Sequence, residues 1–144
     1  MYAQPHLDRP APAMTYDQML ERVRYDGAYA TRERAEAATT AVLAALGRQI
    51  IGDERVDLAA RLPIEAALHF TGQVPATEHL TGWGFVKDLA DRTGGTPATT
   101  RWDVGAVFTV VAELAGHELL TRILTQLPNG YALLFGRAEL IQAA

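Results

Sequence analysis

Residues 61–70 read RLPIEAALHF, and residues 126–135 read QLPNGYALLF. In both stretches a Leu-Pro pair interrupts a sequence that is otherwise typical of helices. Proline is tolerated in the first turn of a helix, where its missing N–H has no intrahelical partner, and it pushes the preceding residue out of helical geometry. Leu62-Pro63 and Leu127-Pro128 therefore predict corners, with a short new helix over residues 63–70. The alternative is a kink within one continuous helix.

The sequence before the first corner predicts three more helices. Thr15 and Thr31 stand at positions typical of N-caps, and apolar residues follow each of them at helical spacing. We expect the first helix to end near Gly27, because glycine is common at helix C-termini. The long second helix reaches Ile50, and Asp53 is expected to cap the third helix.

The second half of the chain repeats this order about 65 residues later. Thr81 and Thr96 take the places of the first two caps. Gly94-Gly95 follows the first helix of this half, and Gly116 precedes the third. We therefore predict an all-α protein with an internal duplication, in which two tandem pseudo-repeats of about four helices each pack as one helical bundle. The predicted organisation is a flexible N-terminal arm (1–14), a first repeat (15–70), a connector (71–80), a second repeat (81–136) and a C-terminal tail (137–144).

Residues 104–111, VGAVFTVV, allow two interpretations. Their β-branched side chains favour a buried strand, but the spacing between Thr96 and Gly116 suits a long helix. The corresponding segment of the first half, AEAATTAVLAAL, is typical of a helix. We predict a helix here as well. Because it is apolar on nearly all sides, we expect it to be largely buried and to lie at the centre of the molecule.

The stretch AVLAALGRQI (41–50), followed by Gly-Asp-Glu and then by DLAARLP (57–63), resembles the bacterial family known as domain of unknown function 2267. The second copy, which ends in QLP, resembles it too, and the similarity runs from about Thr15 to Phe135. The Leu-Pro corner is its most specific part. The resemblance implies a small, soluble, all-helical bacterial protein. It implies no catalytic residues, because the family has no assigned function.

Composition limits the classes of function. The chain has 144 residues, no cysteine and a net charge of −4, with acids and bases balanced in each half. Without clustered Lys and Arg side chains, nucleic-acid binding is disfavoured. No apolar run is long enough to span a membrane, and the N-terminus lacks the order of a signal peptide. We expect a cytoplasmic protein, and the bias towards Arg and Ala indicates a GC-rich bacterial genome.

No catalytic or metal-binding pattern stands out in the sequence. Serine and cysteine are both missing, which removes two common nucleophiles. No glycine-rich stretch has the context of a phosphate loop. The spacing of a metal-ligating pair is also absent from the four histidines, His6, His69, His79 and His117. We therefore predict a non-enzymatic protein with no cofactor and no metal. An enzyme with a dispersed acid–base site is the alternative.

Two tryptophans, Trp83 and Trp102, occur in the second half, at positions where the first half has polar or small residues. Trp102 follows Arg101, and Trp and Arg are enriched in binding hot spots. Trp83, Arg101 and Trp102 are therefore candidate contact residues. The alternative is that the tryptophans occupy space where the two halves differ, or that they cover the connector.

These observations favour a non-enzymatic protein-interaction module that binds an unknown protein partner, and homodimerisation stays open. The alternative is a regulator that binds a small apolar ligand in a pocket between the two repeats. Nucleic acid and membrane are not expected as partners. A deep and mostly enclosed cavity would favour the ligand, whereas an exposed patch that includes Trp83 or Trp102 would favour the protein partner.

Overall fold

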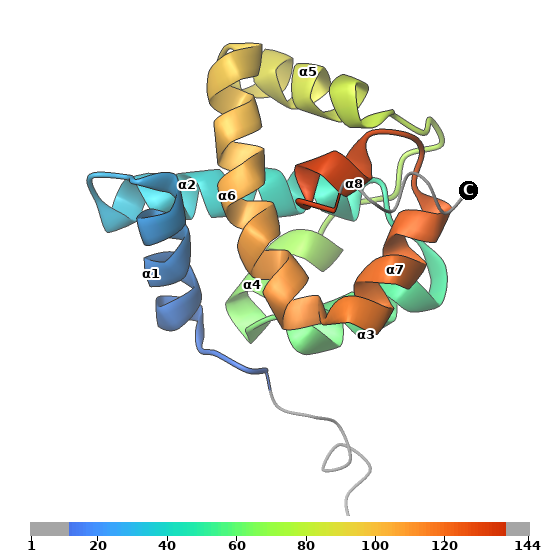
Figure 1. Ribbon diagram of the computed structural model, residues 1–144, viewed down its shortest axis with the longest axis horizontal. Coiled ribbons are helices and arrows are strands. Elements are labelled where there is room, and N and C mark those ends of the chain that lie inside the picture. Colours follow the sequence, from blue (N-terminus) through green and yellow to red (C-terminus); the bar gives the residue numbers. More distant parts are fainter. Residues whose placement is uncertain (1–11, 138–144) are drawn as a thin grey trace, which may run out of the picture.

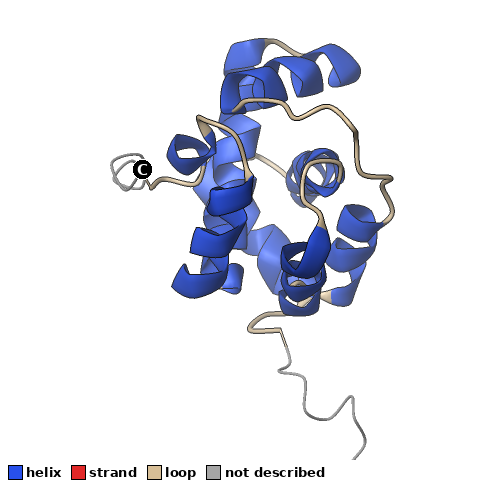
Figure 2. Cartoon of the chain, turned by 90° about the vertical axis from the view of Figure 1, so that its right-hand side faces the viewer, coloured by secondary structure: helices blue, strands red, loops and turns tan. Residues whose placement is uncertain are grey.

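The computed structural model describes residues 12–137, and within this range all regular structure is helical, as the sequence predicts (Figures 1 and 2). The predicted arm, 1–14, and tail, 137–144, lie almost entirely outside the described residues. No helix in this range combines the length and apolar character needed to cross a membrane. The helices are α1 (Tyr16–Gly27), α2 (Arg32–Gly47), α3 (Gly52–Arg61), α4 (Ile64–Thr71), α5 (Gly82–Thr93), α6 (Pro97–Ala115), α7 (His117–Gln126) and α8 (Tyr131–Leu134).

Threonine side chains cap the N-termini of the first two helices in each half. The hydroxyls of Thr15, Thr31, Thr81 and Thr96 each accept a hydrogen bond from the backbone N–H three residues later, at 3.0 to 3.2 Å. These four predicted caps are confirmed. The cap predicted at Asp53 is wrong, because the backbone enters α3 at Ile51, which makes no side-chain cap bond. Asp53 lies in the first turn instead, where its charge favours the positive end of the helix.

Both Leu-Pro pairs are corners, so the alternative of a continuous kinked helix is wrong. Leu62 ends α3 with an extended backbone (φ −86°, ψ 149°), and α4 begins at Ile64. Pro63 is therefore the residue before α4 and not its first residue, and its carbonyl accepts from the N–H of Ala67 at 2.8 Å. Leu127 likewise ends α7 (φ −89°, ψ 150°), but α8 begins only at Tyr131.

The second of the long helices, α6, is the most apolar part of the core. Residues 104–111 are helical, so the strand alternative is wrong. Val104, Val107, Phe108, Val110 and Val111 have no exposed surface. Helix α6 runs across α2 in Figure 1 and packs against α1, α2, α3, α5, α7 and α8. The predicted central position of this helix is therefore confirmed.

Part of the helix packing is reciprocal between the two halves of the chain. Each long helix, α2 and α6, contacts both of the 12-residue helices, α1 and α5. The short helix α4 packs on α2, and its counterpart α8 packs on α6. The two ten-residue helices, α3 and α7, pack on each other.

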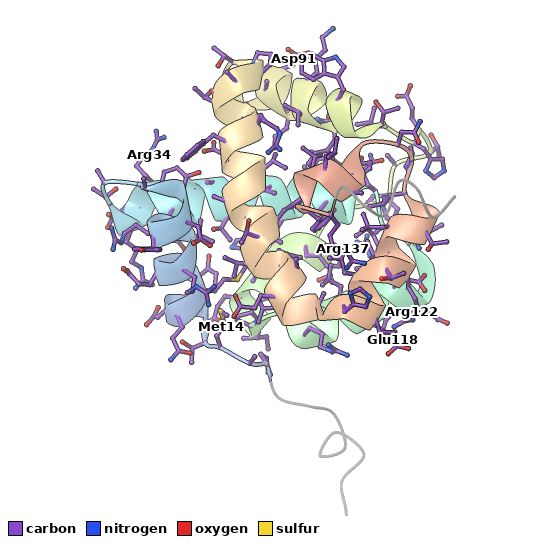
Figure 3. The ribbon with its side chains drawn as sticks, in the orientation of Figure 1. Met14, Arg34, Asp91, Glu118, Arg122 and Arg137 are labelled. Carbon is purple, nitrogen blue, oxygen red and sulfur yellow. The ribbon has the colours of Figure 1, made fainter. Side chains whose placement is uncertain are left out.

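Hydrogen bonds between the halves follow the same reciprocity. Arg61, the last residue of α3, donates to the carbonyl of Ala115 at 2.6 Å, where α6 passes into α7. Gln126, the last residue of α7, pairs with the N–H and the carbonyl of Ile51 at 2.9 and 3.2 Å, where α2 passes into α3. Arg122, labelled in Figure 3, adds an ion pair from α7 to α3. These contacts support the internal duplication, which stays a prediction.

A close approach of two backbones joins α2 to α4. Gly47, the last residue of α2, packs against the carbonyl of Phe70, and a Cβ on Gly47 would overlap that oxygen. The guanidinium of Arg55, on α3, lies 5.4 Å from the centre of the Phe70 ring. It donates to backbone carbonyls of Gly47, Ile50, Thr71 and Gln73. One side chain thus satisfies carbonyls at the ends of α2 and α4 that have no partner within their helices.

Gly47→Ala is expected to lower the free energy of unfolding by about 2 kcal/mol or more, because the added methyl group forces α2 and α4 apart. Gly105→Ala is the matched control within a long helix. There the added Cβ meets the far end of the flexible Arg101 side chain, so stability should be unchanged or should rise by up to about 1 kcal/mol. Urea denaturation measures the free energy of unfolding of the two variants. Equal values for Gly47→Ala and Gly105→Ala would contradict the proposed role of Gly47.

Candidate functional site

Trp102 lies in the second turn of α6 and is held in a fixed orientation while remaining exposed. Its indole N–H donates to the carbonyl of Gly27 at 2.8 Å, at the C-terminal end of α1. The chain turns sharply there, since Ala28 adopts a left-handed conformation (φ 54°). Despite this bond, 57% of the Trp102 surface faces solvent. The ring is therefore ordered before any partner contacts it.

A shallow depression of about 550 Å³, here called the Trp102 groove, runs between α6 and α8. Arg101 and Trp102 line one side, and Leu133, which is 51% exposed, lines the other. The remaining lining residues are Asp26, Ala98, Gly105, Ala106, Thr109, Leu134 and Gly136. A large aromatic ring, a guanidinium and an aliphatic side chain thus share one open surface.

The structure does not bring Trp83 into this groove. Trp83 lies in the first turn of α5 and is 63% exposed. The residue before it, Gly82, packs backbone to backbone against Gly130, and its N–H donates to the carbonyl of Asn129 at 2.6 Å. Of the three candidate contact residues, two lie together in the Trp102 groove and Trp83 does not line it.

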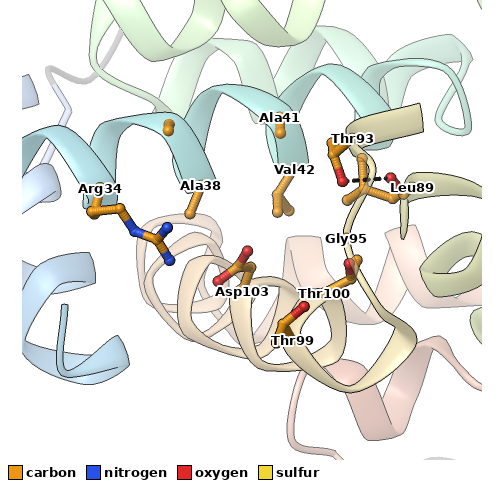
Figure 4. A pocket seen from close by; sticks show the side chains of 11 residues that line it. Arg34, Ala38, Ala41, Val42, Leu89, Thr93, Gly95, Thr99, Thr100 and Asp103 are labelled. Carbon is orange, nitrogen blue, oxygen red and sulfur yellow. Dashed lines mark hydrogen bonds between the residues drawn. The ribbon is translucent and has the colours of Figure 1, made fainter. Parts of the chain in front are cut away.

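A second depression, here called the α2–α6 groove, has a volume of about 420 Å³ and lies between α2 and the α5–α6 junction (Figure 4). It separates segments that belong to the two predicted repeats. None of the three candidate contact residues lines it, although a pocket between the two repeats was part of the alternative prediction. The available signal was the run of alanines on α2, because small side chains at helical spacing leave room beside the helix.

Ionisable groups gather at one end of the α2–α6 groove. The hydroxyl of Tyr29 donates to the carboxylate of Asp103 at 2.5 Å. Burial first, and then the neighbouring Asp103, raise the pKa of Tyr29 above its usual value. Tyr29 therefore stays protonated at neutral pH and orients the carboxylate. Within residues 12–137, no three carboxylate or imidazole side chains are grouped closely enough to hold a metal ion.

The family described as "Uncharacterized conserved protein (DUF2267)" matches residues 16–134, from the first residue of α1 to the last residue of α8. The chain belongs to this family. The resemblance predicted from the Leu-Pro corner and its flanking helices is confirmed. No curated protein matches the chain. The family description assigns no function.

Trp102→Phe is expected to lower the free energy of unfolding by about 1 kcal/mol, because the phenyl ring cannot donate to Gly27. Trp83→Phe is the matched control, since the Trp83 indole makes no hydrogen bond to the described residues, and its effect should stay within about 0.5 kcal/mol. Urea denaturation followed by circular dichroism measures both. Equal losses in the two variants would show that the Gly27 bond does not contribute.

Proposed function

We propose that this DUF2267 family member is a non-enzymatic protein-interaction module and that its partner binds at the Trp102 groove. The observation that carries the proposal is the exposed indole of Trp102, anchored on Gly27. Exposed aromatic surface is unfavourable in water and favourable in an interface. A side chain already held in place loses little conformational entropy on binding, which increases its contribution to affinity.

The residues around Trp102 indicate which side chains a partner would present to it. Leu133 and Ala106 offer an apolar strip beside the indole, and Arg101 forms no ion pair with any described residue. An apolar side chain next to an Asp or Glu would match this combination, because the carboxylate can pair with the guanidinium while the apolar group covers the strip. The groove is shallow and open, which suits a protein surface better than an enclosed small molecule.

The test is affinity capture from the native cell with four single variants and the wild-type protein. Trp102→Ala and Arg101→Ala remove the proposed contacts. Trp83→Ala and Arg92→Ala are matched controls, because each removes an exposed residue of the same type on α5. One protein should be retained by the wild type and both controls and lost from Trp102→Ala, with a loss of binding free energy of about 2 kcal/mol or more once the partner is purified.

Two outcomes would contradict the proposal. A partner retained equally by all four variants would bind elsewhere on the surface. A partner lost from the two controls as well would not depend on the Trp102 groove. Sedimentation equilibrium of the wild type and of Trp102→Ala identifies the remaining case, in which the captured protein is a second copy of this chain.

A further inference from the structure

The α2–α6 groove has an apolar wall and room for a small molecule. Ala38, Ala41 and Val42 face it from α2, and Leu89 faces it from α5 (Figure 4). The two alanines hold the space open, since a larger side chain at either position would fill it. A volume of about 420 Å³ falls within the range of small-molecule sites in proteins.

The side chain of Thr100 faces this space. Thr100 is 5% exposed, and its side chain makes no hydrogen bond within residues 12–137. The comparably buried Thr39 donates its hydroxyl to the carbonyl of Ala35 at 2.8 Å. The oxygen of the Thr100 hydroxyl is not one of the fully buried side-chain atoms without a partner in the described chain, so it reaches the surface of the groove. Its hydroxyl lines the groove, where a bound molecule can reach it.

Opposite charges that do not pair with each other lie beside this hydroxyl. Arg34 extends from α2 towards Asp103 on α6 (Figure 4), yet the guanidinium forms no ion pair with any described residue. It lies 5.9 Å from the centre of the Tyr29 ring, and Tyr29 also holds Asp103 by its hydroxyl. Asp103 and Thr100 are three residues apart on α6, so they share one face of the helix.

We infer that the α2–α6 groove binds a small zwitterion with an aliphatic body, the chemistry of an aliphatic α-amino acid. Arg34 pairs with its carboxylate, as guanidinium groups do with carboxylates. Asp103 and the hydroxyl of Thr100 accept hydrogen bonds from its ammonium group. The aliphatic chain covers the wall formed by Ala41 and its neighbours. This site is separate from the Trp102 groove and does not depend on the protein-interaction proposal.

Charge balance favours a zwitterion over a simple acid or amine. A carboxylate alone would pair with Arg34 but would be repelled by Asp103. An amine alone would pair with Asp103 but would be repelled by Arg34. A ligand that carries both charges satisfies both side chains at once. Its ammonium group can also donate to the hydroxyl of Thr100, which makes no hydrogen bond within residues 12–137.

The test is an NMR titration of the protein with L-leucine at millimolar concentrations, with the methyl signals of Val42 and Leu89 as reporters. Saturable shifts are expected at both residues. Two analogues each lack one charge: 4-methylpentanoate has no ammonium group, and 3-methylbutylamine has no carboxylate. Each should bind at least about tenfold more weakly, since each loses a charge-assisted hydrogen bond. No saturable shift with L-leucine, or equal binding of the analogues, would overturn the inference.

Variants test the assignment of the charged end. Arg34→Gln should weaken L-leucine binding by about tenfold or more. Arg32→Gln is the matched control, because Arg32 is also exposed on α2 but pairs with Asp17 and does not line the groove. Trp102→Ala should leave the L-leucine titration unchanged, which separates this site from the Trp102 groove. Unaltered affinity in Arg34→Gln would overturn the assignment.

Thr100→Val separates a binding role from a structural one. Valine has nearly the same shape as threonine, so it removes the hydroxyl and keeps the packing. Since that hydroxyl has no partner in the described chain, the melting temperature should stay the same or rise, while affinity for L-leucine falls. A lower melting temperature with unchanged affinity would assign Thr100 to the fold and overturn its role in the site.

Discussion

The arrangement of this protein depends on the burial of α6. From Val104 to Ala115 this helix carries apolar side chains on most of its faces. Burying apolar surface stabilises the folded chain by about 25 cal/mol per Å², so such a helix is stable only when other helices cover it. Helices α1, α2, α3, α5, α7 and α8 pack around it. The remaining helix, α4, packs on α2 and α3 instead.

The first turns of α6 are covered less completely, and both candidate sites lie there. Trp102 and Arg101 face the groove towards α8, whereas Thr100 and Asp103 face the groove towards α2. Consecutive helical residues point about 100° apart, so Trp102 and Asp103 reach different surfaces although they are neighbours in the chain. One segment of helix thus borders a proposed protein-binding surface and a proposed small-molecule site.

Local chemistry made much of the fold predictable. Threonine caps and Leu-Pro corners act on the backbone within a few residues, so their positions could be predicted without knowledge of the packing. The cap predicted at Asp53 was a local error, whereas the different starts of α4 and α8 depend on distant parts of the chain. Helix α8 begins later than its counterpart because Gly130, with φ 98°, turns the chain so that its backbone meets Gly82. No residue near Pro128 indicates this contact.

The sequence alone determined the all-helical class, the family and most helix boundaries. It also showed that Arg101 and Trp102 are adjacent in the chain. The tertiary structure decided that Trp102 is anchored on Gly27 while remaining exposed. It also brought Arg34 towards Asp103, from helices that are far apart in the chain. The physical reason is that helical periodicity reports which side of a helix is apolar, but it does not report which other helix covers that side or where the covering ends.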